Sequence, residues 1–290
     1  MIIPSVRADS FIIVDNQSGR ILAASEENRK VQVASLTKVA TAMVILDMVQ
    51  IQRLGLSEMV AISPLALRAG GANPVGLQEG DQMTVRDLLY CSLLASDNIA
   101  ATALAQHAGA RLPNPEGLSA VGNFVAHMNA LARKLQMKRT LFLNPTGLDG
   151  GEGTQPHSTA ADMARLTRYA YTEADFPFFV AQQSRTVKVV RSGQEMSFSI
   201  RNTNELLGQE EIDGVKTGQT ARAGGCLILS SELPPEVKRD GATTFVSPRR
   251  IHVVLLGSGD RFGRGLALTR EGWRLYKTWA ADGRKVGKSL

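Results

Sequence analysis

The sequence predicts an α+β fold: an antiparallel β-sheet flanked by helices, with a mostly helical subdomain inserted between its early and late strands. Three observations lead to this prediction. Two short apolar runs near the start resemble the arms of a hairpin, a block of helical periodicity follows, and strand patterns return only after residue 185. Strands and helices that occur in separate blocks favour an antiparallel sheet over alternating βαβ units.

The first predicted elements are a hairpin and a long helix. Strands over residues 10–14 and 20–24 flank the run DNQSG at 15–19, which has the composition of a hairpin turn. The next predicted element is a helix over 35–49. Its apolar residues lie on nearly every side, so we expect this helix to be buried.

The middle of the chain is predicted to be helical. The run GGANP at 70–74 is a loop, and Thr84 followed by Asp87 has the spacing of a capping box, which predicts a helix from there to Leu94. Further helices are expected over 98–108, 122–135 and 159–171.

After Arg185 the pattern changes from helical to extended. Strands are predicted over 186–190, 196–200, 225–230 and 251–256, and a final helix over 264–279 precedes a basic tail at 283–290. The whole chain, 1–290, is predicted to be a single domain, with the helical subdomain at about 60–165 and the sheet part at about 10–59 and 166–280.

Composition and charge exclude several functional classes. Of the 290 residues, 43% are hydrophobic and 21% are charged, which is typical of a globular protein and not of a disordered or fibrous one. The excess of 33 basic over 27 acidic residues gives a net charge of +6, but the basic residues form no dense run, so no nucleic-acid partner is expected. The four histidines and two cysteines match no metal or redox spacing, so neither a metal nor another cofactor is expected.

The N-terminus lacks the basic and apolar regions of a signal peptide, and no stretch reaches the roughly 18 apolar residues of a membrane span. Two interpretations follow: the protein is made without a signal, or the signal has been trimmed. Cys91 lies in the apolar run 88–94 and is expected to be a small buried hydrophobe, so cysteine usage leaves the redox compartment open.

Three short motifs are candidates for a functional site, and the first is Ser35-Leu-Thr-Lys38 at the start of the predicted buried helix. Residues i and i+3 share a helix face, so the Lys38 amine can reach the Ser35 hydroxyl. A serine in the first turn also lies beside backbone N–H groups that lack helical partners, and such groups can bind a developing oxyanion. A lysine in an apolar buried helix is costly, so we expect Lys38 to have a functional role.

The second motif is Ser96-Asp97-Asn98, at the junction of two predicted helices. Because Ser, Asp and Asn are the usual N-cap residues, helix capping alone would explain all three. The functional alternative is that the Ser96 hydroxyl relays a proton and that the Asn98 amide holds a substrate amide.

The third motif is Lys216-Thr217-Gly218, followed by Gln219. If this segment is a strand, Lys216 and Gly218 lie on one side and Thr217 lies on the other. A glycine at that point permits close backbone approach, as when an extended peptide is added to a sheet edge. The structural alternative is a surface turn with a solvated lysine.

The ordered set S-x-x-K, S-D-N and K-T-G resembles the motif set of penicillin-binding proteins and class A β-lactamases. From about Ser10 to Trp279, the chain is also similar to the D-alanyl-D-alanine carboxypeptidases of peptidase family S11, the low-molecular-mass penicillin-binding group. The similar segments are ASLTKVATA at 34–42, ASDNIA at 95–100, FLNPTGLD at 142–149, HSTAADM at 157–163, NTNELL at 202–207 and DGVKTGQT at 213–220.

The resemblance implies a β-lactamase/transpeptidase-like fold and a serine-type carboxypeptidase. Such an enzyme removes the terminal D-alanine from peptidoglycan stem peptides, and β-lactam antibiotics inhibit it covalently. The implied catalytic residues are Ser35 as nucleophile, Lys38 as base and Ser96 as proton relay. The implied substrate-binding residues are Asn98, Lys216, Thr217, Gly218 and Gln219. Because stem peptides lie outside the cytoplasmic membrane, a periplasmic or other extracytoplasmic location is also implied.

This role requires a neutral Lys38 at physiological pH. An unperturbed lysine has a pKa of about 10.4, so the pKa must fall by roughly 3.4 units to reach about 7. We expect burial and the nearby positive charge of Lys216 to lower it. The backbone N–H groups of Ser35 and Gln219 would form the oxyanion hole that the family implies.

The chain departs from the family in three respects. No β-rich domain or amphipathic anchor follows the catalytic domain before Leu290, so any peripheral membrane association would need residues outside this sequence. Asp97 stands where carboxypeptidases often have glycine. Thr203 stands where some relatives have an arginine that binds the substrate carboxylate, which leaves Thr217 as the expected carboxylate partner.

Three alternative functions share these motifs or this family: a D,D-endopeptidase that cleaves peptidoglycan cross-links, a class A-like β-lactamase, and an inactive wall-binding protein. A class A β-lactamase needs a deacylating glutamate with an asparagine four residues later, and no glutamate between Asn98 and Lys216 has one. An inactive binding protein would not need a buried lysine beside Ser35.

Overall fold

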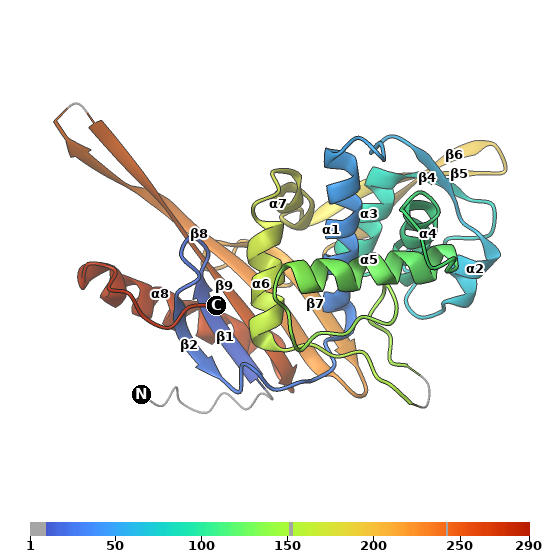
Figure 1. Cartoon of the computed structure of the whole chain (residues 1–290). Helices are drawn as coiled ribbons and strands as arrows, with labels where there is room; N and C mark the ends of the chain where they lie inside the picture. Colours follow the sequence, from blue (N-terminus) through green and yellow to red (C-terminus); the bar gives the residue numbers. More distant parts are fainter. Residues whose placement is uncertain (1–9, 151–152, 242) are drawn as a thin grey trace.

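The computed structural model describes residues 10–150, 153–241 and 243–290, and the strands in those ranges form two antiparallel sheets. A hairpin, a block of helices, further strands and a last helix follow one another along the chain, as predicted (Figure 1). The prediction of an α+β fold with helices inserted between early and late strands is confirmed.

The larger sheet has five strands in the order β2-β1-β9-β8-β7. They are β1 (Ser10–Asp15), β2 (Ile21–Ser25), β7 (Ile212–Thr220), β8 (Gly224–Asp240) and β9 (Thr243–Ser258). Both faces of this sheet are buried, because the neighbouring residues Ile12 and Ile13 of β1 belong to two different hydrophobic clusters. The strand that carries Lys216, β7, lies at one edge of the sheet.

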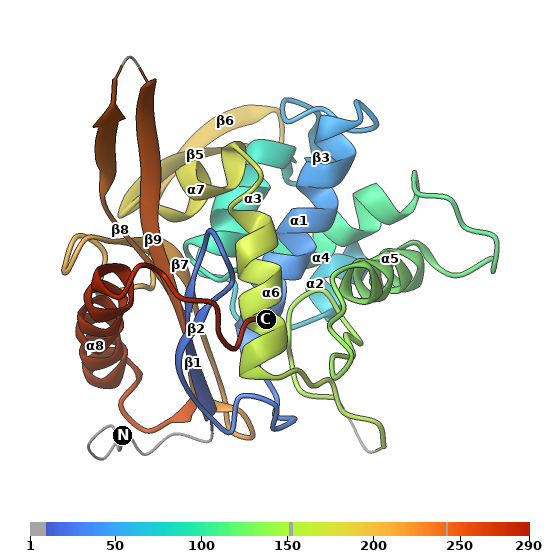
Figure 2. The same ribbon diagram turned by 60° about the vertical axis from the view of Figure 1, so that its left-hand side comes forward.

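Helices cover both faces of the larger sheet. Figure 2 shows α8 (Arg261–Ala281) on one side of it and α1 (Thr37–Gln50) with α6 (Ala160–Ala170) on the other. The remaining helices are α2 (Pro64–Arg68), α3 (Val85–Leu93), α4 (Asn98–Gly109), α5 (Ala120–Lys134) and α7 (Asp175–Val180). In the ranges that the structure describes, no helix is both long and apolar enough to cross a membrane.

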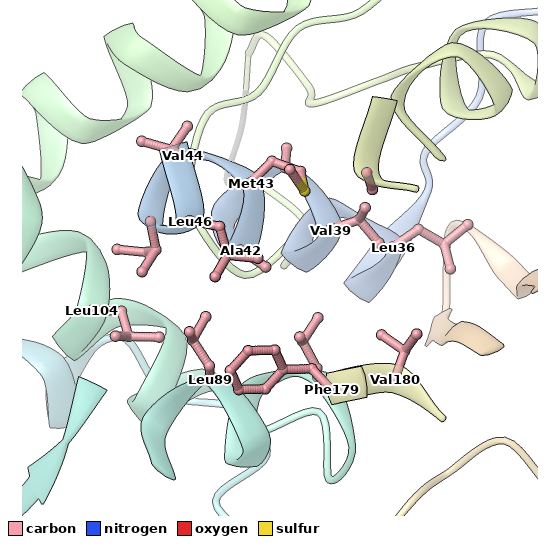
Figure 3. Close-up of a cluster of buried hydrophobic side chains, with 14 of the residues drawn as sticks. Leu36, Val39, Ala42, Met43, Val44, Leu46, Leu89, Leu104, Phe179 and Val180 are labelled. Atoms are coloured by element: carbon pink, nitrogen blue, oxygen red, sulfur yellow. The ribbon is translucent and has the colours of Figure 1, made fainter. Parts of the chain in front are cut away.

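Helix α1 lies at the centre of the helical part. All of residues 37–46 are buried, which confirms the burial that the apolar sequence predicts. Figure 3 shows Ala42 and Val39 of α1 facing Leu89 of α3 and Phe179 of α7. This packing fixes the helix whose first turn carries the candidate nucleophile.

The smaller sheet was not predicted as a separate unit. It has the order β3-β4-β5-β6. Its strands are β3 (Met59–Ala61), β4 (Gln82–Thr84), β5 (Ser184–Arg191) and β6 (Gln194–Arg201). The strands β3 and β4 have only three residues each, and neither was predicted. Such short strands have too little alternation of apolar and polar residues to be recognised from sequence.

Strands β8 and β9 run much further than the predicted ranges 225–230 and 251–256. They extend together as a projecting hairpin arm (Figure 1). Pro234 and Pro235 normally end a paired strand, because proline cannot donate to the ladder. In this hairpin the register shifts between Leu233 and Glu236, and pairing resumes beyond the prolines.

Candidate active site

Ser35 lies in a tight 3₁₀ turn, η1 (Ala34–Leu36), immediately before α1. The predicted helix over 35–49 is therefore divided into this turn and α1. Ala34 and Leu36 are buried, whereas Ser35 is partly exposed. Ala34 has a φ of +47°, in the left-handed region that is costly for a residue with a Cβ atom. The turn thus presents one hydroxyl to solvent from a buried backbone.

Lys38 is fully buried one turn further along, and its amine has three oxygen partners. The Lys38 Nζ atom donates to Ser35 Oγ at 2.9 Å, to Asn98 Oδ1 at 2.6 Å and to the Thr146 carbonyl oxygen at 3.0 Å. Three donors with three acceptors fix the amine in position. The i, i+3 spacing thus places the lysine against the serine hydroxyl, as its place on the helix suggests.

Burial lowers the pKa of Lys38 to about 7, and the negative charge of Asp97 opposes that shift. The charge of Lys216, which we expected to contribute, interacts with Lys38 as a repulsion between the two amines. Lys216 is itself buried, and burial together with the charges of Lys38 and Arg261 lowers its own pKa well below the ordinary value. Because repulsion between two like charges is mutual, the expectation that Lys216 helps to lower the pKa of Lys38 stays a prediction.

The third motif lies on the edge strand β7, not on a surface turn. Lys216 and Thr217 are 1% and 4% exposed, and Lys216 Nζ donates to the Thr217 carbonyl oxygen at 3.0 Å. A Cβ atom on Gly218 would lie 3.0 Å from Ser35 N and 3.1 Å from Val33 O. Glycine therefore allows β7 to approach the turn of the candidate nucleophile, and this contact is what joins the first and third motifs.

The second motif links α3 to α4. Asp97 caps α4 by accepting a hydrogen bond from Ala100 N at 2.9 Å, so the capping interpretation holds for this residue. Burial raises the pKa of Asp97 to about 6. The Asn98 side chain accepts from Lys38 and donates to the Gly70 carbonyl oxygen at 3.3 Å. The loop predicted at 70–74 therefore packs on the site.

Ser96 is the predicted catalytic residue whose side chain is not hydrogen-bonded to either lysine of the site. It is partly exposed and has a φ of +59°. Among the described residues, no hydrogen bond joins its hydroxyl to Lys38 or Lys216. The structure thus brings together Ser35, Lys38, Asn98 and Gly218 by direct contact, and leaves the hydroxyl of Ser96 without such a link.

Several residues of the site were not singled out from the sequence. Thr146 supplies a carbonyl oxygen to Lys38, and the next residue, Gly147, has a φ of +80°. A Cβ atom on Gly147 would lie 1.8 Å from Ala34 O, so only glycine fits beside the nucleophile turn. Both belong to the run FLNPTGLD at 142–149, and the turn-forming residues Asn144, Pro145 and Gly147 in it were the available signal.

Two residues outside the three motifs, Thr203 and Arg261, contact β7. The Thr203 hydroxyl lies 2.6 Å from the Thr217 hydroxyl, and Arg261 Nη1 donates to the Gly218 carbonyl oxygen at 3.0 Å and to Gln219 Oε1 at 3.1 Å. Arg261 is the first residue of α8 and is 43 residues from Gly218 in the sequence. Nothing in the local pattern around Arg261 predicts this contact.

The geometry suits nucleophilic catalysis. A partly exposed hydroxyl is bonded to an amine whose pKa of about 7 allows it to accept a proton near neutral pH. In the part of the chain that the structure describes, no group of three or more His, Cys, Asp or Glu side chains is arranged to hold a metal ion.

Comparison of the sequence with known proteins finds similarity to D-alanyl-D-alanine peptidases. The family model for D-alanyl-D-alanine carboxypeptidases, Peptidase S11, matches residues 2–233. The D-alanyl-D-alanine carboxypeptidase DacF of Bacillus subtilis (strain 168) is 30% identical over 226 residues, 78% of this chain and 54% of the relative. A D-alanyl-D-alanine endopeptidase of Pseudomonas aeruginosa is 34% identical over 230 residues, 77% of this chain and 67% of the relative. The chain thus spans from about half to two thirds of the length of these relatives.

Solved structures show the same fold. The crystal structure of the Streptomyces K15 DD-transpeptidase is similar with a TM-score of 0.80 and 26% identity, over 94% of this chain and 100% of that one. The D-alanyl-D-alanine carboxypeptidase DacD of Francisella tularensis is similar with a TM-score of 0.74 and 25% identity, over 93% of this chain and 72% of that one. The expected transpeptidase-like fold is confirmed.

Proposed function

This chain belongs to the D-alanyl-D-alanine carboxypeptidase family, and from this premise we propose that it is a serine-type hydrolase that removes the terminal D-alanine from peptidoglycan stem peptides. The observation that carries the proposal is the bond between Ser35 Oγ and the buried amine of Lys38, at 2.9 Å. A lysine without a functional role would not be expected to be fully buried beside a partly exposed serine, because taking an ammonium group out of water is costly even when it is hydrogen-bonded.

In the proposed acylation step, Ser35 Oγ attacks the carbonyl carbon of the penultimate D-alanine while its proton moves to Lys38 Nζ. With its pKa lowered to about 7, Lys38 has a neutral form that is populated near pH 7 and can accept that proton. The tetrahedral intermediate carries an oxyanion, which the backbone N–H groups of Ser35 and Gln219 stabilise. The close approach of Gly218 to Ser35 N supports this placement of the two donors.

Collapse of the intermediate breaks the peptide bond and leaves the stem peptide esterified to Ser35. The departing amine of D-alanine needs a proton, which Lys38 now carries and which Ser96 relays in this proposal. Water then hydrolyses the ester and regenerates the Ser35 hydroxyl. Ser96 must turn its hydroxyl toward the amine for this step, and its partial exposure leaves room for such a rotation.

Substrate binding is proposed along the open edge of β7. An extended stem peptide can add to this edge as a further antiparallel strand, with backbone hydrogen bonds to the segment around Gln219. The amide nitrogen of Asn98 carries two N–H donors, and its bond to Gly70 uses one of them, so the other is available for a substrate carbonyl. Thr217 and Lys216 would lie near the terminal carboxylate.

The same acylation explains the proposed sensitivity to β-lactams. Penicillin would acylate Ser35, and its retained thiazolidine ring would hinder the approach of water. A class A β-lactamase overcomes this with a glutamate base, and the sequence has no glutamate with the required asparagine four residues later. General-base help is worth about 10²- to 10⁴-fold, so the penicilloyl ester should persist far longer than the ester of a stem peptide.

A second candidate function is D,D-endopeptidase activity on peptidoglycan cross-links, because a relative that is 34% identical over 230 residues is named an endopeptidase. The bond broken and the site would be the same. Both substrates lie outside the cytoplasmic membrane, so the proposal includes an extracytoplasmic location for either activity.

One experiment separates these functions. Release of D-alanine from diacetyl-Lys-D-Ala-D-Ala, cleavage of a cross-linked muropeptide dimer, and decay of a preformed penicilloyl adduct are measured on the same preparation. The proposal predicts rapid D-alanine release and slow adduct decay. Preferential cleavage of the dimer would favour an endopeptidase. Rapid adduct decay without D-alanine release would indicate a β-lactamase. The absence of all three activities would indicate a binding protein.

A further inference from the structure

Strands β8 and β9 continue beyond the body of the protein as the projecting arm, residues 233–241 and 243–249 (Figure 1). Three large hydrophobic side chains lie on it in contact with solvent: Val237, Phe245 and Val246 are 57%, 55% and 58% exposed. A two-stranded ribbon with neither face covered is only marginally stable in water. An arm that exposes apolar side chains on both of its strands is therefore a candidate interaction surface.

The root of the arm is fixed on the body of the protein. On β8, Glu236 Oε2 accepts a hydrogen bond from Arg284 Nη2 of the C-terminal tail at 2.7 Å. On β9, Arg249 Nε donates to the Pro234 carbonyl oxygen. These bonds hold both strands where they leave the larger sheet, so the fold sets the direction of the arm. A fixed arm loses little conformational entropy when it binds.

The two edges of the arm differ in chemistry. The β8 edge begins with Pro234 and Pro235 and carries the charged residues Arg239 and Asp240, features that protect a strand edge from pairing. The β9 edge is the uncharged run TTFVS at 243–247, which consists mostly of β-branched and aromatic residues. Strand β1 pairs with β9 only over residues 251–256, so among the described strands none covers the outer side of 243–247. The β9 edge is thus open to pairing.

The pairing within the arm indicates which backbone groups face outward. Asp240 and Thr243 are paired across two connecting residues, and the closing pair of such a hairpin is hydrogen-bonded. Hydrogen-bonded and non-hydrogen-bonded pairs alternate along an antiparallel ladder from there. Thr244 and Val246 therefore turn their N–H and C=O groups away from β8. A partner strand can bond all four groups only if it offers the same spacing.

A second copy of the same chain offers this spacing. When two β9 edges pair in antiparallel fashion about a two-fold axis at Phe245, Thr244 of each copy lies opposite Val246 of the other, and all the outward groups are bonded. The two Phe245 side chains then form a directly opposed aromatic pair, and no charged residues of the run 243–247 are opposed. Because each arm projects from its own body, the two bodies lie at opposite ends of the joined sheet (Figure 2).

A cavity at the root of the arm lies where the turn of a second copy would reach. In the register centred on Phe245, Gly241 of one copy comes level with Arg249 of the other. The cavity has a volume of about 190 Å³, and residues that line it include Ser18, Val246, Ser247, Pro248, Trp279 and Arg284. Among the described residues, Arg249 has no acidic partner and Asp240, beside the turn, has no basic one. Their opposite charges approach each other in the paired arms.

We propose that residues 243–247 of the arm are the interface of a symmetric dimer of this chain, in which two arms join into one four-stranded antiparallel sheet. The proposal goes beyond the function of the site around Ser35 and does not depend on it. A single strand edge is at the small end of protein interfaces, so the dimer should be reversible. The turn of the arm carries Arg239 and Asp240, whereas a hairpin that enters a bilayer needs an apolar tip.

The first test places proline on either edge of the arm. Val246 and Val237 are paired with each other and almost equally exposed, and neither N–H bonds within the hairpin in this register. Val246→Pro removes an outward N–H from the proposed interface, and Val237→Pro, the matched control, removes one from the opposite edge. Sedimentation equilibrium measures the dissociation constant of the dimer, and circular dichroism with thermal melting checks the fold.

Wild type should show a reversible equilibrium between monomer and dimer. Val246→Pro should raise the dissociation constant about 10- to 100-fold, because each dimer loses two hydrogen bonds. Val237→Pro should change it by less than about threefold. A wild type that stays monomeric up to near-millimolar concentration would overturn the proposal, and so would equal effects of the two proline variants.

The second test does not depend on whether the arm tolerates proline. Opposed residues of a non-hydrogen-bonded pair bring their Cβ atoms close together, so Phe245→Cys should give a disulfide-linked dimer under mild oxidation. Val237→Cys, on the outer strand of the joined sheet, should remain mostly monomeric on a non-reducing gel. The native thiols of Cys91 and Cys226 are buried and should not compete.

Equal cross-linking of Phe245→Cys and Val237→Cys would show random collision and overturn the proposal. A monomeric wild type that binds vesicles of phosphatidylglycerol, with binding lost in Phe245→Cys, would assign the arm to a membrane surface instead. None of these measurements uses a peptide substrate or penicillin, so their outcome is distinct from success or failure of the proposed activity of Ser35.

Discussion

The Lys38 amine is held between an acceptor on the nucleophile turn, one on α4 and one on the loop at Thr146. Its environment favours the neutral form, because a fully buried ammonium loses its hydration and the charge of Asp97 offsets only part of that loss. At the scale of single residues, the protonation state of one group therefore controls whether Ser35 can be activated.

The rate of acylation should depend on pH through Lys38. The ammonium form cannot accept a proton, so the second-order rate constant for acylation by penicillin should rise about tenfold per pH unit at acid pH and level off above about 7. The measurement is stopped-flow acylation between pH 5 and 9. A rate that does not vary over this range would contradict the role of Lys38.

The Asp97→Asn variant tests the cause of the pKa. Asn caps a helix about as well as Asp, so α4 should be retained. The charge of Asp97 raises the pKa of Lys38, so its removal should lower that pKa and move the midpoint of the acylation profile to lower pH. A midpoint that moves to higher pH would mean that Asp97 does not act on Lys38 through its charge.

The Lys38→Arg variant tests the base role itself. A guanidinium remains protonated, so this variant should lose covalent labelling by fluorescent penicillin even if it folds. Circular dichroism and thermal melting check that the fold is retained. Labelling within tenfold of the wild-type rate would remove Lys38 from the role of base and would direct attention to Ser96.

At the scale of elements, the sequence predicts contacts that depend on local spacing and not those that depend on packing. Ser35 and Lys38 are three residues apart, so helical geometry alone brings their side chains together. The Thr146 carbonyl and the Arg261 guanidinium reach the site from distant segments. Their positions depend on how the loop and α8 pack against the sheet, and no local periodicity records this.

The loop that carries Thr146 should be sensitive to any side chain at Gly147. A Cβ atom at this position, where φ is +80°, would lie 1.8 Å from Ala34 O. Gly147→Ala should therefore lower the free energy of unfolding by about 3 kcal/mol or more and slow acylation, because the nucleophile turn must shift. Thermal or denaturant unfolding and penicillin labelling give the two measurements.

Gly193→Ala is the matched control, since Gly193 has a φ of +78° but no atom within 4 Å of the added Cβ. It should lose only the cost of a left-handed alanine, about 1 kcal/mol, with normal acylation. Equal effects in the two variants would show that backbone conformation, and not the contact with Ala34, is what Gly147 provides.

At the scale of the whole molecule, the order of elements was enough to predict the fold class, whereas the two-sheet arrangement was not. The smaller sheet joins the three-residue strands β3 and β4 to the hairpin of β5 and β6, about a hundred residues later. Strand pairing over that distance is decided by the tertiary fold. The hydrophobic cluster around α1 extends from Ile12 of β1 to Phe124 of α5 and Val187 of β5.

Because one hydrophobic cluster joins the helical part to both sheets, we predict that the chain unfolds as a single domain. Differential scanning calorimetry should show one transition whose calorimetric enthalpy equals the van't Hoff enthalpy. Two separable transitions, or a calorimetric enthalpy well above the van't Hoff value, would mean that the helical subdomain and the sheet part fold independently.

The most direct measurement of the central claim, that Ser35 is the acylated nucleophile, is the location of the penicilloyl adduct. The protein is incubated with penicillin, digested, and examined by peptide mass spectrometry beside the Ser35→Ala variant, which should fold normally because Ser35 is partly exposed. We expect a single adduct, on the peptide that contains Ser35, and no adduct in the variant. An adduct on another residue, or one that persists in Ser35→Ala, would contradict it.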